Sequence, residues 1–278
     1  MTARLPGAMV IGAPKAGTTT LCAALSRVPR LWMYPRKETH FFNHHYEARG
    51  MDWYADLFAP APDDHLIMEG TPDYAMSNHV AASMRRMRRH MPDARLIYMT
   101  RDPVARIESH YVQMVANVRH ALPIGEALAK WPEIVETSDY AAILRVIHDH
   151  FPPEQVHVLS LEDYRADRRF HHAGLLRFLG LPPDPATLDA MAHQRPLHRR
   201  RDQAMDGALL ARLRRLRSYD RLNAMVPKPI VRMGKRVLRR RIEVDSTLPG
   251  DLRASLAARL DPPWTALRAA YAPAGASS

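Results

Sequence analysis

A glycine-containing loop between a short apolar run and a helix-like segment limits what this chain can fold into. Residues 12–20 read Gly-Ala-Pro-Lys-Ala-Gly-Thr-Thr-Thr; the apolar run 8–11 precedes them and the helix-like run 21–25 follows. A strand, a glycine loop and a helix N-terminus in this order place backbone N–H groups around a bound phosphate. The loop therefore predicts a phosphate-binding turn at the end of a strand in an α/β sheet.

The position of its lysine separates this loop from a nucleoside-triphosphate P-loop. Gly12 and Gly17 have P-loop spacing, but Thr18 stands where such a loop has Lys, and the only lysine of the loop is Lys15. A kinase P-loop needs that Lys to reach the β/γ-phosphates and the next Ser or Thr to hold Mg²⁺. Taken alone, the loop also fits an ordinary strand-to-helix turn in which Thr18 caps the helix.

A second motif follows another predicted strand. The segment 94–100 is mostly apolar and runs into Arg101-Asp-Pro103, with Arg106 and Ser109 spaced along the helix that follows. Pro103 suits the first helical turn, where its missing N–H is no loss. Arg101 and Ser109 can both face the crevice in which open α/β sheets bind ligands, and Arg binds phosphate through paired N–H bonds. A second anion-binding position is therefore predicted beside the loop.

In combination, the two motifs resemble those of sulfotransferases that use 3′-phosphoadenosine 5′-phosphosulfate (PAPS). The resemblance implies that the 5′-phosphosulfate is held by Lys15, Ala16, Gly17, Thr18, Thr19 and Thr20. It implies that Arg101 and Ser109 hold the 3′-phosphate. Three further stretches follow the order seen in heparan-sulfate-type sulfotransferases, at residues 36–42, 52–54 and 68–74. Residues 156–164 and 178–181 resemble a later strand and helix shared by many sulfotransferases.

Three polar residues are candidates for the chemical step. Sulfuryl transfer to an alcohol needs a base for the hydroxyl proton and cations for the moving sulfonate, as phosphoryl transfer does. The resemblance implies that Glu38 is the base, because the matching Glu has that role in heparan-sulfate-type enzymes. His40 is the rival base, since cytosolic sulfotransferases use a histidine. Lys15 is the candidate cation at the bridging oxygen. A surface ion pair of Glu38 with Lys37 or Arg36 is the non-functional alternative.

The chain departs from the glycosaminoglycan enzymes at several positions. Gly70 stands where they carry Lys, and Asn43 stands where they often have Asp. Their cysteine pair is missing, because Cys22 is the only cysteine. No stretch approaches the ~20 apolar residues of a membrane span, so we expect no counterpart of their anchor. These differences favour a small molecule, a lipid or a simple glycan as the hydroxyl acceptor.

The pattern of elements predicts one α/β domain over residues 1–278, a length that can bury a large core. Strands are predicted at 8–11, 66–69, 95–99 and 156–160. Helices are predicted at 18–27, 51–58, 77–90, 103–118, 138–150, 163–179, 207–218, 229–240 and 249–270. This alternation indicates a P-loop-like, three-layer fold with a central, mostly parallel sheet and helices on both faces.

Other residues bear on the compartment and on metals. We see no secretory signal before Gly12 and expect a cytoplasmic protein, with which a lone cysteine is consistent. Cys22 is expected to be a small core residue. His44 and His45 are adjacent in a strand-like stretch, so they would point opposite ways, and no metal site is expected.

A basic stretch at 195–241 accounts for the net charge of +11, since it holds sixteen Lys or Arg residues and three Asp. Its first half has a leucine stripe and predicts a basic amphipathic helix, which suits a lid over cofactor and acceptor or an anionic membrane. Packing of the stripe on the core is the alternative. The resemblance implies that a late basic segment helps bind the 3′-phosphate, and the candidates are residues 232–235 and the run of Arg239, Arg240 and Arg241. Nucleic acid is not expected, because no recognition motif is present.

We therefore expect a sulfotransferase that moves the sulfuryl group from PAPS to a hydroxyl and releases 3′,5′-adenosine diphosphate (PAP). A small-molecule kinase of related fold is one rival, and the displaced Lys15 argues against it. A non-catalytic scaffold on anionic membranes or nucleic acid is the other. Retention of Lys15, Glu38, Arg101 and Ser109 argues against the scaffold. The sequence does not define the oligomeric state.

Overall fold

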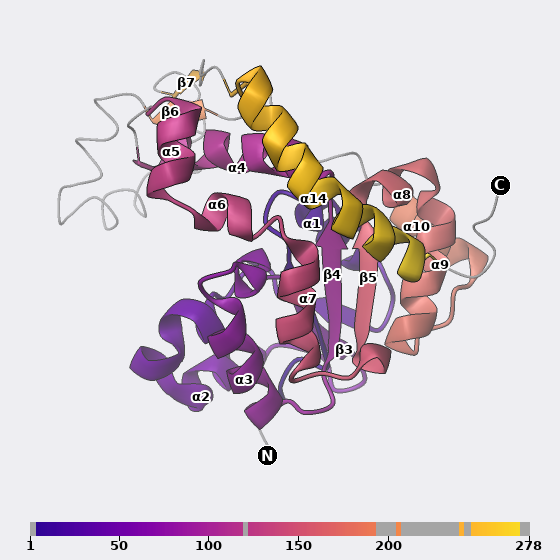
Figure 1. Ribbon diagram of the computed structural model, residues 1–278. Coiled ribbons are helices and arrows are strands. Elements are labelled where there is room, and N and C mark those ends of the chain that lie inside the picture. Colours follow the sequence, from indigo (N-terminus) through magenta and orange to yellow (C-terminus); the bar gives the residue numbers. More distant parts are fainter. Residues whose placement is uncertain (1–3, 119–121, 193–203, 207–238, 242–245, 273–278) are drawn as a thin grey trace.

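The centre of the protein is a five-stranded parallel sheet in the order β2-β3-β1-β4-β5. It is seen in a computed structural model that describes residues 4–118, 122–192, 204–206, 239–241 and 246–272 (Figure 1). The strands are β1 (Ala8–Gly12), β2 (Leu31–Met33), β3 (Leu66–Glu69), β4 (Arg95–Thr100) and β5 (Val156–Ser160). The α/β fold with a parallel sheet is thereby confirmed.

Strand β1 lies in the middle of the sheet, and all five of its residues are buried. Its continuous apolar sequence is typical of a strand that is covered on both faces. It pairs with β3 on one side and with β4 on the other, so that Ala8 lies opposite both Met68 and Arg95. The carboxyl ends of these neighbouring strands therefore meet at one edge of the sheet, where the loop 12–20 begins.

Helices cover both faces of the sheet. The helices are α1 (Thr18–Leu25), α2 (Tyr46–Asp56), α3 (Val80–His90), α4 (Pro103–Val118), α5 (Ile124–Lys130), α6 (Glu133–Glu136), α7 (Tyr140–His148), α8 (Leu161–Ala166), α9 (Arg168–Leu179), α10 (Pro185–Ala192) and α14 (Gly250–Ala270). The chain leaves β1 toward β2 and later returns from β3 to β4 and β5. Right-handed crossovers in these opposite directions place α1 on one face and α3, α4 and α7 on the other. The direction in which the chain adds strands to the sheet thus reverses beside β1, and open α/β sheets bind ligands at such points.

Several predicted elements differ from those observed. Strand β2 was missed, because three residues are too few to show a period. The predicted helix 163–179 is two helices, since the Asp167 side chain accepts a hydrogen bond from Phe170 N and starts α9. His44 and His45 lie in a π-helical turn (Phe41–His45) and not in a strand.

Most of the basic stretch 195–241 lies outside the described residues, including the predicted helix 207–218 and residues 229–238. The described parts are strands β6 (Ala204–Asp206) and β7 (Arg239–Arg241), which pair antiparallel. The prediction that the helix 229–240 includes Arg239 and Arg240 is therefore wrong, because both belong to β7. The expected lid stays a prediction.

The C-terminal helix α14 contacts the helices α4 and α7 (Figure 1). Leu256, Leu260 and Trp264 are its buried residues, spaced four apart on one face as an amphipathic helix requires. Trp264 Nε1 donates a hydrogen bond of 3.3 Å to Thr100 Oγ1, at the carboxyl end of β4. The helix therefore supports the strand end from which Arg101 follows. No helix among the described residues is long and apolar enough to cross a membrane.

We predict that Trp264→Ala destabilises the whole domain, because it empties a core position and removes the bond to Thr100. Large-to-small changes of this kind cost about 3–5 kcal/mol, which corresponds to a fall in melting temperature of roughly 10 °C in a domain of this size. Differential scanning calorimetry measures the effect. Arg259→Ala, on the exposed side of the same helix, is the control and should melt like the parent protein. Equal melting of both variants would contradict the role given to α14.

Candidate functional site

The loop after β1 has the conformation of an anion cradle. Lys15 and Gly17 have φ angles of 71° and 90°, and α1 begins directly after Gly17. A Cβ atom at Gly17 would lie 2.6 Å from Leu161 Cδ1, so both the backbone angle and the space require glycine here. The tight turn brings Lys15 to the N-terminus of α1, where backbone N–H groups favour a negative charge.

Two arginines from the second motif hold this loop in place. Arg101 Nη1 donates to Lys15 O at 3.2 Å, which joins the end of β4 to the loop after β1. Arg106 is fully buried, and its Nε donates to Pro14 O at 3.1 Å. The two segments that the sequence singled out are therefore in direct contact.

Arg106 is buried among neutral hydrogen-bond partners. Its Nη1 donates to Ile134 O at 2.7 Å and to Ser138 Oγ at 2.8 Å. Its Nη2 lies 2.8 Å from His110 Nδ1. A guanidinium has only donors, so His110 accepts through Nδ1 and carries its own proton on Nε2. Burial, followed by the charge of Arg106, holds the pKa of His110 well below its usual value and keeps this ring neutral.

Several positive charges lie around Lys15 in the loop. Burial and then the charges of Arg101, Arg106 and Lys37 lower the pKa of Lys15 to about 8. A lysine whose pKa is depressed by other cations is stabilised by any anion that binds beside it. The cradle, the helix N-terminus and these cations therefore fit a phosphate or phosphosulfate group.

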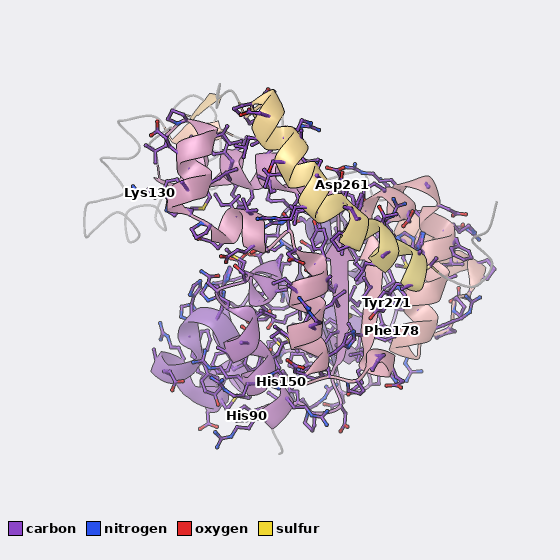
Figure 2. All side chains as sticks on the ribbon, in the orientation of Figure 1. His90, Lys130, His150, Phe178, Asp261 and Tyr271 are labelled. Carbon is purple, nitrogen blue, oxygen red and sulfur yellow. The ribbon has the colours of Figure 1, made fainter. Side chains whose placement is uncertain are left out.

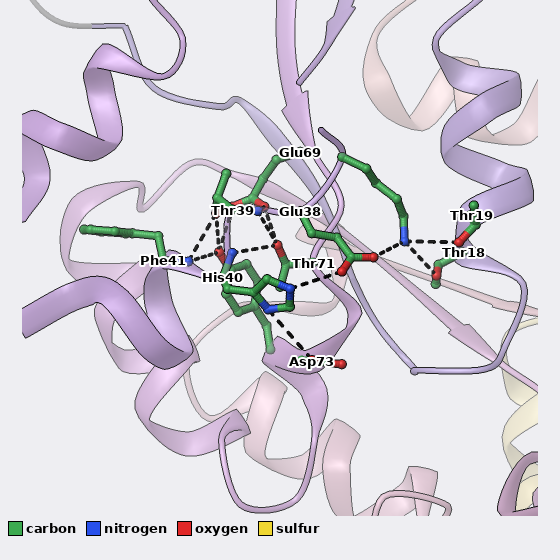
Figure 3. A network of polar contacts seen from close by, with 11 residues as sticks. Thr18, Thr19, Glu38, Thr39, His40, Phe41, Glu69, Thr71 and Asp73 are labelled. Carbon is green, nitrogen blue, oxygen red and sulfur yellow. Dashed lines mark hydrogen bonds and ion pairs between the residues drawn. The ribbon is translucent and has the colours of Figure 1, made fainter. Parts of the chain in front are cut away.

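A buried carboxylate, Glu69 at the end of β3, positions the segment that carries the candidate bases (Figure 3). Its oxygens accept hydrogen bonds from Thr39 Oγ1 at 2.9 Å and Thr71 Oγ1 at 2.6 Å. Tyr54 and Tyr74 donate to it at 2.9 and 2.8 Å. Burial raises the pKa of Glu69, and these four side-chain hydrogen bonds oppose that rise. Because Thr39 is held on both its backbone N–H and its hydroxyl, its neighbours Glu38 and His40 are fixed as well.

Glu38 lies between His40 and the loop hydroxyls of Thr18 and Thr19 (Figure 3). Its Oε2 is 3.1 Å from His40 Nε2, and its Oε1 accepts a hydrogen bond of 2.7 Å from Lys37 Nζ. Burial would raise the pKa of Glu38, but the hydrogen bonds and charges of His40 and Lys37 lower it to about 2. The hydrogen bond to Glu38 in turn raises the pKa of His40, and Asp73, 3.8 Å away, acts in the same direction. Each member of this pair therefore stabilises the charged form of the other.

For three of the predicted site residues, the role in binding the cofactor stays a prediction. Ser109 lies two turns into α4 and is nearly buried, so its contact with a 3′-phosphate stays a prediction. Arg239 and Arg240 lie in β7, and their role also stays a prediction. Cys22 is a buried core residue as expected, and burial raises the pKa of its thiol to about 12. The described residues contain no group of three His, Cys, Asp or Glu side chains that could hold a metal.

Sequence reasoning missed three residues that shape the site. Glu69 and Arg106 were quoted within motifs but given no role, because nothing local shows that a charged residue is buried. Lys37 was considered only as a surface partner of Glu38. The structure shows that ion pair. It also shows that the Lys37 side chain is mostly buried and that its Nζ donates to Thr18 Oγ1 in the loop.

Comparison with known proteins identifies the family. The family model for the sulfotransferase domain matches residues 5–211. The heparan sulfate glucosamine 3-O-sulfotransferase 3B1 of Homo sapiens is 32% identical over 188 residues, which are 64% of this chain and 47% of that protein. The membrane-associated sulfotransferase kil1 of Dictyostelium discoideum is 36% identical over 110 residues, which are 38% of this chain and 22% of that protein. The chain thus spans about half, or less, of the length of these relatives.

A solved structure has a similar fold. A sulfotransferase from Alicyclobacillus acidocaldarius aligns with a TM-score of 0.65 and 23% identity, over 96% of both chains. The geometry and the family match therefore place the chain in the class of phosphosulfate-binding α/β proteins. The chain belongs to the family of PAPS-dependent sulfotransferases, and the family expected from its motifs is confirmed.

The depressed pKa of Lys15 predicts that PAP binding weakens at alkaline pH. Below about pH 8 Lys15 is charged in the free protein, and affinity is full; as pH rises through 8 the free protein loses this proton. Binding must then restore the proton, so affinity should fall about tenfold or more by pH 9.5. Calorimetric titration of PAP at several pH values measures this. Lys15→Arg stays charged over the range and should show a flat profile. A flat profile in the parent protein would contradict the assignment.

Proposed function

We propose that this protein transfers the sulfuryl group of PAPS to a hydroxyl group and releases PAP. The observation that carries the proposal is the contact between the two halves of the site. The loop with its cations lies on one side, and the Glu38 carboxylate faces the loop hydroxyls through Lys37 on the other. An in-line transfer needs this arrangement, with the donor held at one end and the base for the acceptor at the other.

The residues divide the chemical work between them. The donor supplies an activated sulfonate on its 5′-phosphate. The loop amides, Thr18–Thr20 hydroxyls and Lys15 would hold that group and stabilise the charge that collects on the bridging oxygen. The acceptor oxygen forms a bond to sulfur while the sulfur–oxygen bond to the phosphate breaks. Glu38 accepts the proton of the acceptor hydroxyl, so charge and atoms balance when PAP leaves.

The geometry favours Glu38 over His40 as the base. A base must be unprotonated, and the hydrogen bond to Glu38 and the charge of Asp73 favour a protonated His40. Glu38 is ionised over the whole physiological range, because its pKa is about 2. His40 then acts as a positioning residue that holds one oxygen of Glu38, at 3.1 Å, and leaves the carboxylate oriented toward the loop.

The acceptor hydroxyl belongs to a glycan, a small molecule or a lipid. The relative from Homo sapiens is named for the 3-O-sulfation of heparan sulfate glucosamine, so a glycan hydroxyl is one candidate. A small molecule or a lipid is favoured by the departures at Asn43 and Gly70. The basic stretch 195–241 and the relative named as membrane-associated support peripheral contact with an anionic membrane as a route to a lipid acceptor. A cytoplasmic location stays a prediction. No observation on the described residues favours the kinase or the scaffold.

Nucleotide selectivity tests the donor. We predict that PAP raises the melting temperature well above the shift given by 5′-AMP at equal concentration, because only PAP carries a 3′-phosphate for Arg101. Thermal-shift titration measures both. Arg101→Gln is the matched variant and should bring the PAP shift down toward that of 5′-AMP. Equal shifts in the parent protein would contradict the donor assignment.

Substitution of the two candidate bases tests the catalytic role. Glu38→Gln nearly keeps the shape of the side chain but cannot accept the proton, so turnover of PAPS should fall about 10²-fold or more. PAP affinity should change little, since Glu38 lies on the acceptor side. His40→Ala should cost less than Glu38→Gln, because His40 only positions the carboxylate. Near-normal turnover in Glu38→Gln together with collapse in His40→Ala would transfer the role of base to His40.

A further inference from the structure

Lys37 forms hydrogen bonds both to the donor loop and to the candidate base. Its Nζ lies 3.4 Å from Thr18 Oγ1, 3.4 Å from Thr19 Oγ1 and 2.7 Å from Glu38 Oε1. Its side chain is only 17% exposed. An ammonium group has three donors, and these contacts account for all three. The group thus lies between the loop hydroxyls and the carboxylate of the candidate base.

The backbone of Lys37 is held in an unusual conformation. Four non-glycine residues in the described structure have positive φ, and three of them, Lys15, Lys37 and His40, belong to the site. The φ of Lys37 is 66°, a conformation that costs free energy in a residue with a side chain. Lys37 N donates to Tyr34 O, and Lys37 O accepts from Gly70 N, both at 2.8 Å. These bonds fix the turn that aims the side chain at the loop.

Gly70 leaves room for this path. A Cβ atom at position 70 would lie 2.5 Å from Cys22 Sγ and 3.6 Å from Lys37 Cε. Even the smallest side chain there would have to displace the buried cysteine, while its distance to the lysine would be an ordinary van der Waals contact. Glycine at this position therefore keeps Cys22 in place beside the aliphatic part of Lys37.

We propose that Lys37 is a second sulfonate-binding cation, which exchanges its hydrogen bond to Glu38 for one to the donor's sulfonate. The ammonium keeps its three protons throughout, so this step moves no proton and no electron. Release of Glu38 Oε1 frees a lone pair for the proton of the acceptor hydroxyl, and the positive charge stays with the sulfonate. Lys37 thereby couples occupation of the loop to the availability of the base. The inference rests on the proposed function and deepens it.

The comparison of PAP with PAPS tests this role, because only PAPS carries the sulfonate. Lys37→Met should weaken PAPS binding about tenfold more than PAP binding, as expected for one charge-assisted hydrogen bond. The hydrolysis of PAPS to PAP, with water as the acceptor, should slow about 10²-fold. Calorimetry gives the two affinities, and chromatography of the nucleotides gives the rate.

A matched control is Lys130→Met, which removes one lysine charge at the end of α5, on the outer edge of the molecule (Figure 2). Lys130 lies over the Trp131 ring and should be dispensable for both readouts. Lys37→Gln is the second variant in case the Met variant does not fold, since Gln still offers a donor to Thr18 and Thr19. It should show the same selective loss of PAPS affinity.

Equal weakening of PAP and PAPS in these variants, or parent-like values for both readouts, would overturn the role of Lys37. Failure of the proposed function itself would be seen in the parent protein, which would then bind PAP no better than 5′-AMP and would not consume PAPS. The inference about Lys37 would fall with it.

Discussion

The site depends on two charged side chains that are buried and bonded to neutral groups. Arg106 donates to the carbonyl oxygen of Pro14 in the loop, and Glu69 accepts from Thr39 in the base segment. A buried charge without such hydrogen bonds would cost several kcal/mol, so each of these networks admits few alternative arrangements. The buried arginine thus fixes the donor side of the site and the buried glutamate fixes the base side. The two sides come together because β1, β3 and β4 are neighbours in the sheet.

The charged side chains outside these two networks, Lys15, Lys37 and Glu38, determine what the site can bind. Burial, and then the nearby charges of Arg101, Arg106 and Lys37, lower the pKa of Lys15, so a bound anion would stabilise its charged form. Glu38 accepts a hydrogen bond from Lys37 and lies 3.1 Å from His40. An anionic donor completes the first group and competes for Lys37 with the second. Binding and activation of the base are therefore linked through one shared ammonium group.

Local sequence was sufficient for the parts of the fold that have local causes. The apolar run of β1 and the C-terminal helix each follow from neighbouring residues, and the strand predicted at 8–11 and the helix predicted at 249–270 are confirmed. The helix start after Arg101 was also predicted correctly, because Pro103 suits the first helical turn and comes shortly after the end of β4. Family resemblance, and not pattern alone, supplied the cofactor and the base.

The features that sequence did not predict depend on distant contacts. Glu69 becomes a structural anchor only through hydroxyl groups from Thr39, Tyr54 and Tyr74, which other segments bring to it. Lys37 looked like a surface partner of Glu38, since its contact with Thr18 spans nineteen positions in the chain. The predicted helical end at Arg239 failed because pairing with Ala204–Asp206 places it in a strand. Nothing in the basic sequence around it signals that pairing.

A crystal structure of the protein with bound PAP would test the central claim most directly. The account predicts the 5′-phosphate within hydrogen-bond distance of the backbone N–H groups after Gly17 and of Lys15 Nζ. It also predicts that Lys37 Nζ and the Glu38 carboxylate face that phosphate from the side opposite the adenosine. A 5′-phosphate bound elsewhere, or a Glu38 carboxylate turned away from the loop, would contradict the account.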